Sequence, residues 1–420
     1  MKNLPYAARV ICAASLSNAL EFYDFLIYVF FAVTLSQVFF PPGNPSVSLF
    51  LAIGSSTVSF ISRPIGAIFL GAYADKHGRK SALTVSITLA ASSSLAIGLM
   101  PGYAVIGVAA PLLVVAARLV QGFAVGGEFG SSTALLIEST TNRKAFFASW
   151  QYASQGLTTV FAALVGTGIT TFLSSEQILA WGWRIPFLIG VSVAPVGLFI
   201  RTRLKESPEF LREQAVRKGA ENRANLDRSA AKVIVSIGLV ALATSVGQVM
   251  VSYMPVYAVQ QLHLPPLFAF STLVLNGGVQ FFVCPMIGAF ADRVGAAKVA
   301  LTAAMFSLIF IIPTYWYLNA RASFATLLIV LLGTGILKAA YAGALPVIMG
   351  EFFPTSVRSR GLSISYAIGV TLFGGFGTLL VTWGIHFTGD KLFPAYYVFL
   401  TCVISLVALL IAYRSRWVRD

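Results

Sequence analysis

The feature that most constrains this chain is a series of long apolar segments, each about as long as a lipid bilayer is thick. A helix needs about 20 mostly apolar residues to cross the hydrocarbon core. Twelve such segments follow one another, centred near residues 22, 60, 90, 120, 160, 193, 245, 278, 308, 335, 370 and 402. With 57% hydrophobic and only 10% charged residues, the composition fits no soluble class. We therefore predict an all-α membrane protein with twelve transmembrane helices.

The longest polar interruption divides the predicted spans into two groups of six. We predict an N-terminal six-helix bundle over residues 1–203, a cytoplasmic linker over 204–230 and a C-terminal six-helix bundle over 231–420. Repeated motifs support this division. The pattern G-x-x-x-D-x-x-G begins at Gly71 and again at Gly288, an offset of 217. The two bundles are therefore predicted to be pseudo-symmetric, as in many secondary transporters.

The distribution of charge predicts how the chain lies in the membrane. Most of the 29 basic residues lie near the termini, in the linker or in loops on the same side, whereas Arg184, Arg321 and Lys391 lie on the other side. Basic residues accumulate in cytoplasmic loops. We expect both termini in the cytoplasm and the protein in a bacterial inner membrane. The net charge of +14 does not indicate nucleic-acid binding, because the basic residues are separated by apolar segments.

Ionisable residues inside predicted spans are the main candidates for a functional site, since each costs on the order of 2.5 to 3.5 kcal/mol on insertion scales. Asn18, Glu21, Asp24 and Tyr28 have the spacing of one polar stripe on a helix. We predict that Asp24 or Glu21 binds and releases a proton, with Arg118 as the nearby cation. The alternative is a fixed ion pair between Asp24 and Arg118 that only joins two helices.

Lys338 lies in the second half and Arg118 in the first, so together they are predicted to hold a multivalent anion between the halves. A lysine that extends to the membrane interface is the alternative for Lys338. Arg63 and Glu128 also lie inside spans, where a structural role explains them as well as a functional one. The predicted substrate-binding set is Arg118, Lys338, Asn18, Tyr28, Arg63, Gln121 and Gln155, although bonds between helices explain its polar members equally well.

Motifs for an enzyme or a cofactor are missing from the sequence. The three histidines and three cysteines lack the spacing of metal ligands, so we expect no metal site. We find neither a glycine-rich phosphate loop nor a nucleophile elbow. We therefore expect neither an enzyme nor a cofactor, and we expect an ion gradient to supply the energy.

Several segments resemble one family. GAYADKHGRK from Gly71 closely resembles the signature loop of the major facilitator superfamily, and ARLVQGFAVGGEFG from Ala117 resembles a span motif of its proton-coupled members. NALEFYDF from Asn18 and WGWRIPF from Trp181 are similar to the metabolite:proton symporter family. This resemblance implies the major facilitator fold and symport of a proton with citrate, a dicarboxylate, shikimate, proline or betaine.

Within that family, SWQYASQG from Ser149 and FTGDK from Phe387 look most like the citrate and tricarballylate symporters. We therefore expect a small organic anion, most of all a tricarboxylate, as the substrate. A dicarboxylate such as α-ketoglutarate, a zwitterion such as proline or betaine, a proton-independent facilitator and a receptor without flux remain alternatives. A monomer in the lipid bilayer is expected.

The resemblance also implies a cytoplasmic gate. Its gating role falls on Asp75, Arg79, Glu138 and Arg358, and the repeated motifs add Gly71, Gly78, Asp292 and Glu351. Charge that only sets topology is the alternative. The second copy departs from the pattern, because Ala296 follows Gly295 where the family has a basic residue. A weaker gate is expected there.

Overall fold

The computed structural model describes residues 6–41, 45–202, 206–217, 230–254, 257–258, 261–264 and 266–417, and these residues are almost entirely helical. The helices of the first half are α1 Tyr6–Phe30, α2 Ala32–Phe39, α3 Pro45–His77, α4 Arg79–Leu99, α5 Tyr103–Ile106, α6 Ala109–Glu138, α7 Lys144–Phe172, α8 Ser175–Gln177 and α9 Arg184–Thr202. A π-helical turn, η1 Ile178–Gly182, lies between α8 and α9.

The second half follows α10 Pro208–Arg217, the part of the predicted linker that the structure describes as a helix. Its helices are α11 Ala230–Gly247, α13 Pro266–Val294, α14 Ala296–Ala320, α15 Phe324–Phe352, α16 Arg358–Val370, α17 Gly377–Thr388 and α18 Phe393–Arg414. Two π-helical segments, η3 Gln248–Tyr253 and η5 Thr371–Gly375, continue α11 and α16, and the short 3-10 turn η4 Thr355–Val357 precedes α16. Much of the predicted linker, including residues 218–229, lies outside the described residues, so its boundaries stay a prediction.

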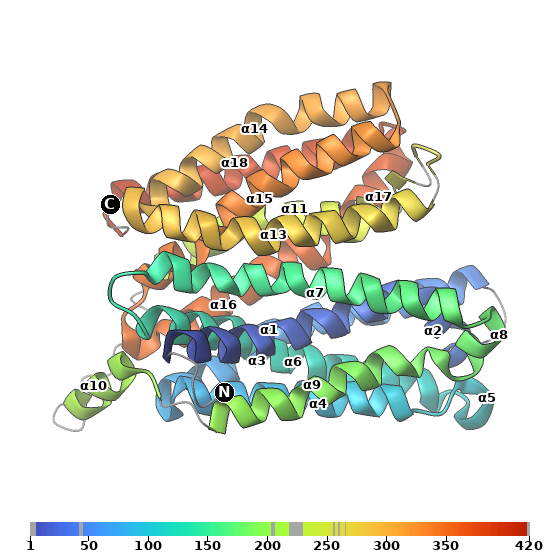
Figure 1. Ribbon diagram of the computed structural model, residues 1–420, viewed down its shortest axis with the longest axis horizontal. Coiled ribbons are helices and arrows are strands. Elements are labelled where there is room, and N and C mark those ends of the chain that lie inside the picture. The colour runs from blue at the N-terminus through green and yellow to red at the C-terminus, as the bar shows by residue number, and fades with distance from the viewer. Residues whose placement is uncertain are drawn as a thin grey trace.

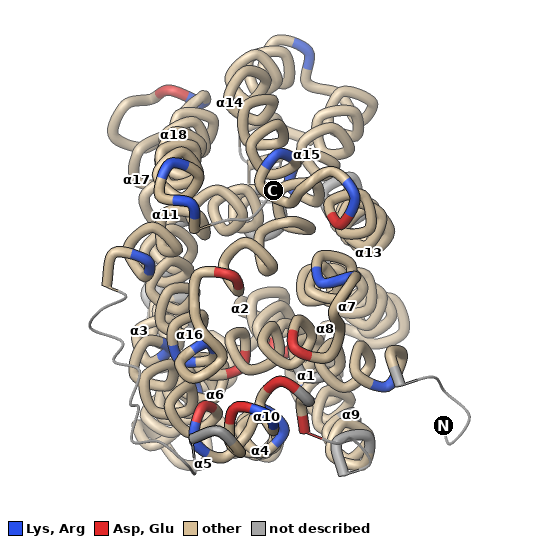
Figure 2. The backbone as a smooth tube through the Cα atoms, turned by 90° about the vertical axis from the view of Figure 1, so that its left-hand side faces the viewer, with Lys and Arg blue, Asp and Glu red and all other residues tan. Residues whose placement is uncertain are grey.

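The long helices lie in two layers (Figure 1). The lower layer contains α1, α3, α4, α6, α7 and α9, and the upper layer contains α11, α13, α14, α15, α17 and α18. The start of α1, the end of α18 and α10 lie at the same end of the molecule, which we call the α10 end. Seen from this end, acidic and basic positions lie close together around α10 (Figure 2).

Ten helical segments of the described chain are long and apolar enough to cross a membrane, or eleven if the bent pair Ser175–Gly182 and Arg184–Phe199 is one span. The predicted span near residue 160 is α7, which is not among them. Its polar side chains, such as Gln151 and Ser154, face neighbouring helices and lower its apolar character. With 29 residues, about 43 Å at 1.5 Å per residue, α7 is long enough to cross.

The two halves meet along two groups of helices. In the first group, α13 and α15 pack against α7, and in the second, α16 packs against α3 and α6. Glycine allows the close approach of α7 and α13: a Cβ on Gly156 would lie 2.5 Å from the carbonyl oxygen of Gly277, and one on Gly277 would lie 2.6 Å from that of Gly156. Small residues serve the same purpose in many membrane helix pairs. The space for a site therefore lies between the halves.

Candidate functional site

A pocket between the two halves brings together three of the charged residues that lie inside spans. Glu21 and Arg63 line it from the first half and Lys338 from the second. Aromatic rings form a large part of the remaining wall, and the neutral polar side chains include those of Thr244 and Gln248. The aromatic residues are Phe22, Phe25, Phe60, Tyr152 and Tyr366. We call this the interface pocket.

Arg63 and Glu21 face each other across the first-half side of the interface pocket. The guanidinium carbon of Arg63 lies 4.2 Å from the centre of the Phe60 ring, a cation–π contact. Among described residues, Nε of Arg63 has no hydrogen-bond partner. Glu21 lies within electrostatic range of Glu128, Arg63 and Asp24. Both charged groups therefore lie at the pocket.

Lys338 does not extend to the membrane interface, so that alternative is wrong. The side chain is buried, with 7% of its surface exposed, and Nζ donates a hydrogen bond of 2.7 Å to Oε1 of Gln280 on α13. Gln280 in turn donates from Nε2 to the carbonyl oxygen of Tyr152 on α7, also at 2.7 Å. Lys338 is thereby connected to the first half through one glutamine.

A second pocket lies inside the first half and contains Asp24, Arg118 and Gln121, together with Glu21 and Arg63. Because Glu21 and Arg63 line both pockets, the two spaces adjoin. Arg118, which we expected beside Lys338, lines this second pocket. The cation that shares the interface pocket with Lys338 is Arg63.

Asp24 and Arg118 are linked by a chain of hydrogen bonds and do not form the direct ion pair that was the alternative. Arg118 Nη1 donates to Gln121 Oε1 at 2.8 Å, and Gln121 Nε2 donates to Ser94 Oγ at 2.9 Å. Ser94 completes the chain by donating to Oδ2 of Asp24. Among the residues that the structure describes, Oδ1 of Asp24 and two nitrogens of Arg118 have no hydrogen-bond partner. Such buried unpaired groups are costly and are often functional.

The predicted stripe on α1 contacts three different helices. Asn18 donates to the carbonyl oxygen of Gln151 at 2.6 Å and to Ser154 at 2.8 Å, so it joins α1 to α7. Gln155 donates to Asn18 over 3.5 Å and also lines the interface pocket. Tyr28 hydrogen bonds with Ser55 on α3, and its ring lies 3.5 Å from the guanidinium carbon of Arg118. Of the stripe, Glu21 and Asp24 line the pockets, while Asn18 and Tyr28 hold helices together.

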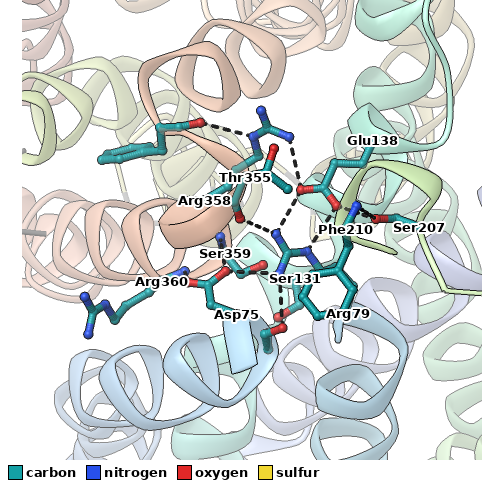
Figure 3. A network of polar contacts seen from close by, with 12 residues as sticks. Asp75, Arg79, Ser131, Glu138, Ser207, Phe210, Thr355, Arg358, Ser359 and Arg360 are labelled. Carbon is teal, nitrogen blue, oxygen red and sulfur yellow. Dashed lines mark hydrogen bonds and ion pairs between the residues drawn. The ribbon is translucent and has the colours of Figure 1, made fainter. Parts of the chain in front are cut away.

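At the α10 end, four of the predicted gating residues, Asp75, Arg79, Glu138 and Arg358, form one network that joins both halves (Figure 3). Arg79 donates to both oxygens of Glu138, at 3.1 and 2.9 Å, and both side chains are buried. Arg358 of the second half donates to the same Glu138 at 3.0 Å. Arg79 also crosses to the second half by donating to the carbonyl oxygen of Thr355 at 2.6 Å. Paired guanidinium–carboxylate bonds of this kind are strong.

Asp75 lies next to this network and caps a helix of the opposite half. Its carboxylate accepts hydrogen bonds from the backbone N–H groups of Ser359 and Arg360, at 3.1 and 3.0 Å, at the start of α16. A carboxylate at a helix N-terminus satisfies free N–H groups and is favoured by the helix dipole. Gly71 allows this approach, because a Cβ there would lie 2.8 Å from Cα of Arg360. Gly78 has a φ of 100°, a conformation that favours glycine.

The segment before and within α10 also binds this network, a role that we did not predict. Ser207 donates to Glu138 at 2.6 Å. Glu206 accepts from the backbone N–H groups of Arg79 and Lys80 at the start of α4. Glu209 accepts from Thr355 and from Arg358, at 2.5 and 3.0 Å. Partial burial alone would raise the pKa of Glu209, but the Thr355 hydrogen bond and the charge of Arg358 lower it below its ordinary value.

The second copy of the repeated motif also caps a helix of the opposite half. Asp292 accepts from the backbone N–H groups of Ala145 and Phe146, at 2.8 and 2.9 Å, and so caps α7 of the first half. Ala296 stands four residues after Asp292, where Arg79 stands after Asp75. Glu351 is exposed, unlike Glu138. A weaker second gate therefore stays a prediction.

Sequence reasoning missed Gln280 and Ser94, which connect the predicted residues to one another. The repeat contained a signal for Gln280, because 280 is 63 plus the motif offset of 217 and Gln280 therefore corresponds to Arg63. Ser94 carried no comparable signal, since serine is common in membrane helices. Its partner Asp24 lies on another helix and only the fold brings them together.

Two layers of membrane-spanning helices, with a polar pocket between them and a charged network that joins them at one end, define a secondary transporter. Residues 15–320 match the family model described as Major Facilitator Superfamily. The chain therefore belongs to the major facilitator superfamily, and it is a transporter and not an enzyme. The structure agrees in fold with the proton:xylose symporter XylE, with a TM-score of 0.78 over 97% of this chain and 95% of that one, at 16% identity.

Two relatives indicate to which family within this superfamily the chain belongs. A citrate-proton symporter of Klebsiella pneumoniae is 34% identical over 94% of this chain and 90% of its own length. A proline/betaine transporter of Salmonella typhimurium is 32% identical over 95% of this chain and 82% of its own length. The chain therefore belongs to the metabolite:proton symporter family, which contains both kinds of relative. Their similar identities do not distinguish the substrate.

Proposed function

We propose that this protein takes up a small organic anion together with a proton by alternating access. The observation that carries the proposal is the interface pocket, where Arg63 and Lys338 present positive charge from opposite halves. With Glu21 ionised, these three side chains sum to a charge of +1, and with Glu21 protonated to +2. A buried excess of positive charge is costly unless an anion neutralises it. Protonation and anion binding therefore favour each other.

Asp24 and Glu21 are the proposed proton carriers. Asp24 is buried and one of its oxygens lacks a hydrogen-bond partner within the described chain. A proton on Asp24 removes a charge that is costly at this depth. Glu21 lines both pockets and so connects Asp24 with the space in which we propose that the anion binds. The hydrogen-bond chain from Arg118 to Asp24 would orient the carboxyl group and respond to its charge.

Access would alternate by separation of the halves at the α10 end, where the network around Glu138 now joins them. We propose that this network closes the cytoplasmic side and that both termini lie there. The protein is proposed to be a monomer in a bacterial inner membrane. The distribution of basic residues supports this orientation.

A tricarboxylate such as citrate is the proposed substrate, supported by the two cations and by the citrate-proton symporters among the relatives. A zwitterion such as proline or betaine is the second candidate, because Glu21 lies beside the cations and proline/betaine transporters are also relatives. An aromatic ring next to a quaternary ammonium group would favour betaine. Arg63 already occupies the face of Phe60, however, which favours the anion.

The test is uptake of labelled citrate into proteoliposomes with and without an imposed inward proton gradient. We expect accumulation that depends on the gradient and is inhibited by tricarballylate more than by proline. Lys338→Gln should raise the KM for citrate at least tenfold, and Asp24→Asn should abolish accumulation. Accumulation of proline without citrate flux would overturn the anion assignment. Uptake that only equilibrates citrate, and is equal with and without the gradient, would indicate a facilitator, and binding without flux a receptor.

A further inference from the structure

Gln280 occupies a position that the proposed transport cycle does not yet use. It lies on α13, is 4% exposed, and both ends of its amide are bonded. Oε1 accepts from Lys338, whose ammonium lines the interface pocket, and Nε2 donates to the carbonyl oxygen of Tyr152 on α7. The amide orientation is fixed, because the ammonium only donates and the carbonyl only accepts. One side chain therefore connects the pocket cation to the opposite half.

The bond from Gln280 lies on the contact between α7 and α13, which we call the seam. On one side of it, the backbones of Gly156 and Gly277 approach closely. On the other, toward the α10 end, a Cβ on Gly288 would lie 2.7 Å from the carbonyl oxygen of Ala145. Asp292 caps α7 beyond that point. The seam crosses between the halves, so alternating access requires that at least part of it opens.

An anion in the interface pocket would compete with Gln280 for Lys338. Carboxylate oxygens accept hydrogen bonds from an ammonium more strongly than a neutral amide oxygen does. When Lys338 turns to an anion, Oε1 of Gln280 loses the donor that holds the amide in place. A buried acceptor without a donor is unfavourable, so the amide would reorient and its bond to Tyr152 would weaken.

We propose that Gln280 is a positioning residue that keeps the seam closed while the pocket is empty and releases it when an anion takes Lys338. This inference rests on the proposed function, since it assumes that Lys338 binds the anion. It explains how a symporter prevents a protonated carrier from reorienting without substrate. Its pseudo-symmetric equivalent, Arg63, lines the interface pocket from the first half. In the first half this repeat position therefore supplies a cation, and in the second half it supplies a hydrogen bond between the halves.

The first test is proton leak in the absence of any organic anion. Gln280→Met keeps the size of the side chain but removes both bonds. We expect it to raise the entry of protons into proteoliposomes, followed with a trapped pH dye, at least fivefold over wild type. Asn276→Leu is the matched control, because it removes a buried amide one turn earlier on α13 whose Nδ2 bonds to no described residue. A leak equal in both variants, or in neither, would overturn the inference.

The second test separates this role from a merely structural one through the KM for citrate. Gln280→Glu places a carboxylate beside Lys338, so citrate must displace a full charge and the KM should rise at least tenfold. Gln280→Met leaves Lys338 without a competitor, so the KM should stay equal or fall. A purely structural residue would change the KM in the same direction in both variants, and that result would contradict the proposal.

Trp150 offers a readout that does not depend on transport. Its ring lies on α7, 5.9 Å from that of Phe281 on α13, across the seam. We expect citrate to change the fluorescence that Trp150→Phe removes, and we expect Gln280→Met to show that change before citrate is added. If wild type transports no anion but Gln280→Met still leaks, only the proposed function fails. If wild type accumulates citrate and Gln280→Met neither leaks nor changes fluorescence, only the role of Gln280 fails.

Discussion

The two copies of the repeated motif have the same backbone arrangement but different side chains around it. In each, an aspartate at the end of a helix caps a helix of the opposite half: Asp75 caps α16 and Asp292 caps α7. In each, a glycine with a φ near 100° follows three residues later, Gly78 at 100° and Gly295 at 105°. The capped helix is therefore the element that the repeat preserves.

Charge distinguishes the two copies. Around Asp75, Arg79 and Glu138 are buried and paired, and Arg358 joins them from the other half. Around Asp292, Ala296 stands at the position equivalent to Arg79, and Glu351 is exposed. Exposed charges contribute little, whereas a buried pair that loses one partner is strongly destabilised. Closure at the α10 end should therefore depend mainly on the first copy.

The largest expected effect is that of Arg79→Ala. It leaves the buried carboxylate of Glu138 with fewer partners and removes the bond to Thr355, and losses of this kind cost about 3 to 5 kcal/mol. Citrate uptake should fall more than a hundredfold, and thermal unfolding in detergent should occur at a lower temperature. Arg143→Ala is the control near the second copy, where the exposed Arg143 only stacks on Phe146 at 4.3 Å. Equal losses would show that the copies are equivalent.

The next comparison exchanges each capping aspartate for asparagine. Asparagine has one acceptor oxygen, so either variant loses one backbone hydrogen bond and the attraction to the helix dipole. Asp75→Asn also removes the negative charge that pairs with Arg79 over 3.2 Å in a buried site, and we expect initial uptake to fall about tenfold. At Asp292 water can replace the lost bond, so the decrease should be less than threefold. A larger loss in Asp292→Asn would mean that the caps, not the ion pairs, limit closure.

The sequence predicted the apolar segments and the repeat because these depend on local composition and spacing. It did not predict which side chains meet across helices. Arg63, and not Arg118, shares a pocket with Lys338, since the two arginines lie on different helices and their facing directions depend on how α3 and α6 pack. The polar residues of α7 bond to neighbouring helices, which no single segment of the sequence reveals.

A smaller effect is expected when the missing arginine is restored. Ala296→Arg places a guanidinium four residues after Asp292, the spacing of Asp75 and Arg79, and such exposed helix pairs contribute about 0.2 to 0.5 kcal/mol. We expect a slight rise in thermal stability and a decrease in uptake of about twofold, because the α10 end opens less readily. Ala296→Gln, with a long neutral side chain, should change neither. A large decrease would show that the second copy also limits opening.

The smallest expected effect is that of Glu209, which accepts hydrogen bonds from Thr355 and Arg358 beside the first copy. Because Thr355 and Arg358 lower its pKa in the folded protein below the ordinary value of 4.5, its anion stabilises the closed end. That contribution is complete above the ordinary pKa and is lost as the pH falls through the lowered folded value. The difference in unfolding temperature between wild type and Glu209→Gln should therefore be constant from pH 7 to about pH 5 and then decrease. A difference that persists in acid would mean that the carboxylate charge contributes nothing, and that the first copy depends on Arg79 and Glu138 alone.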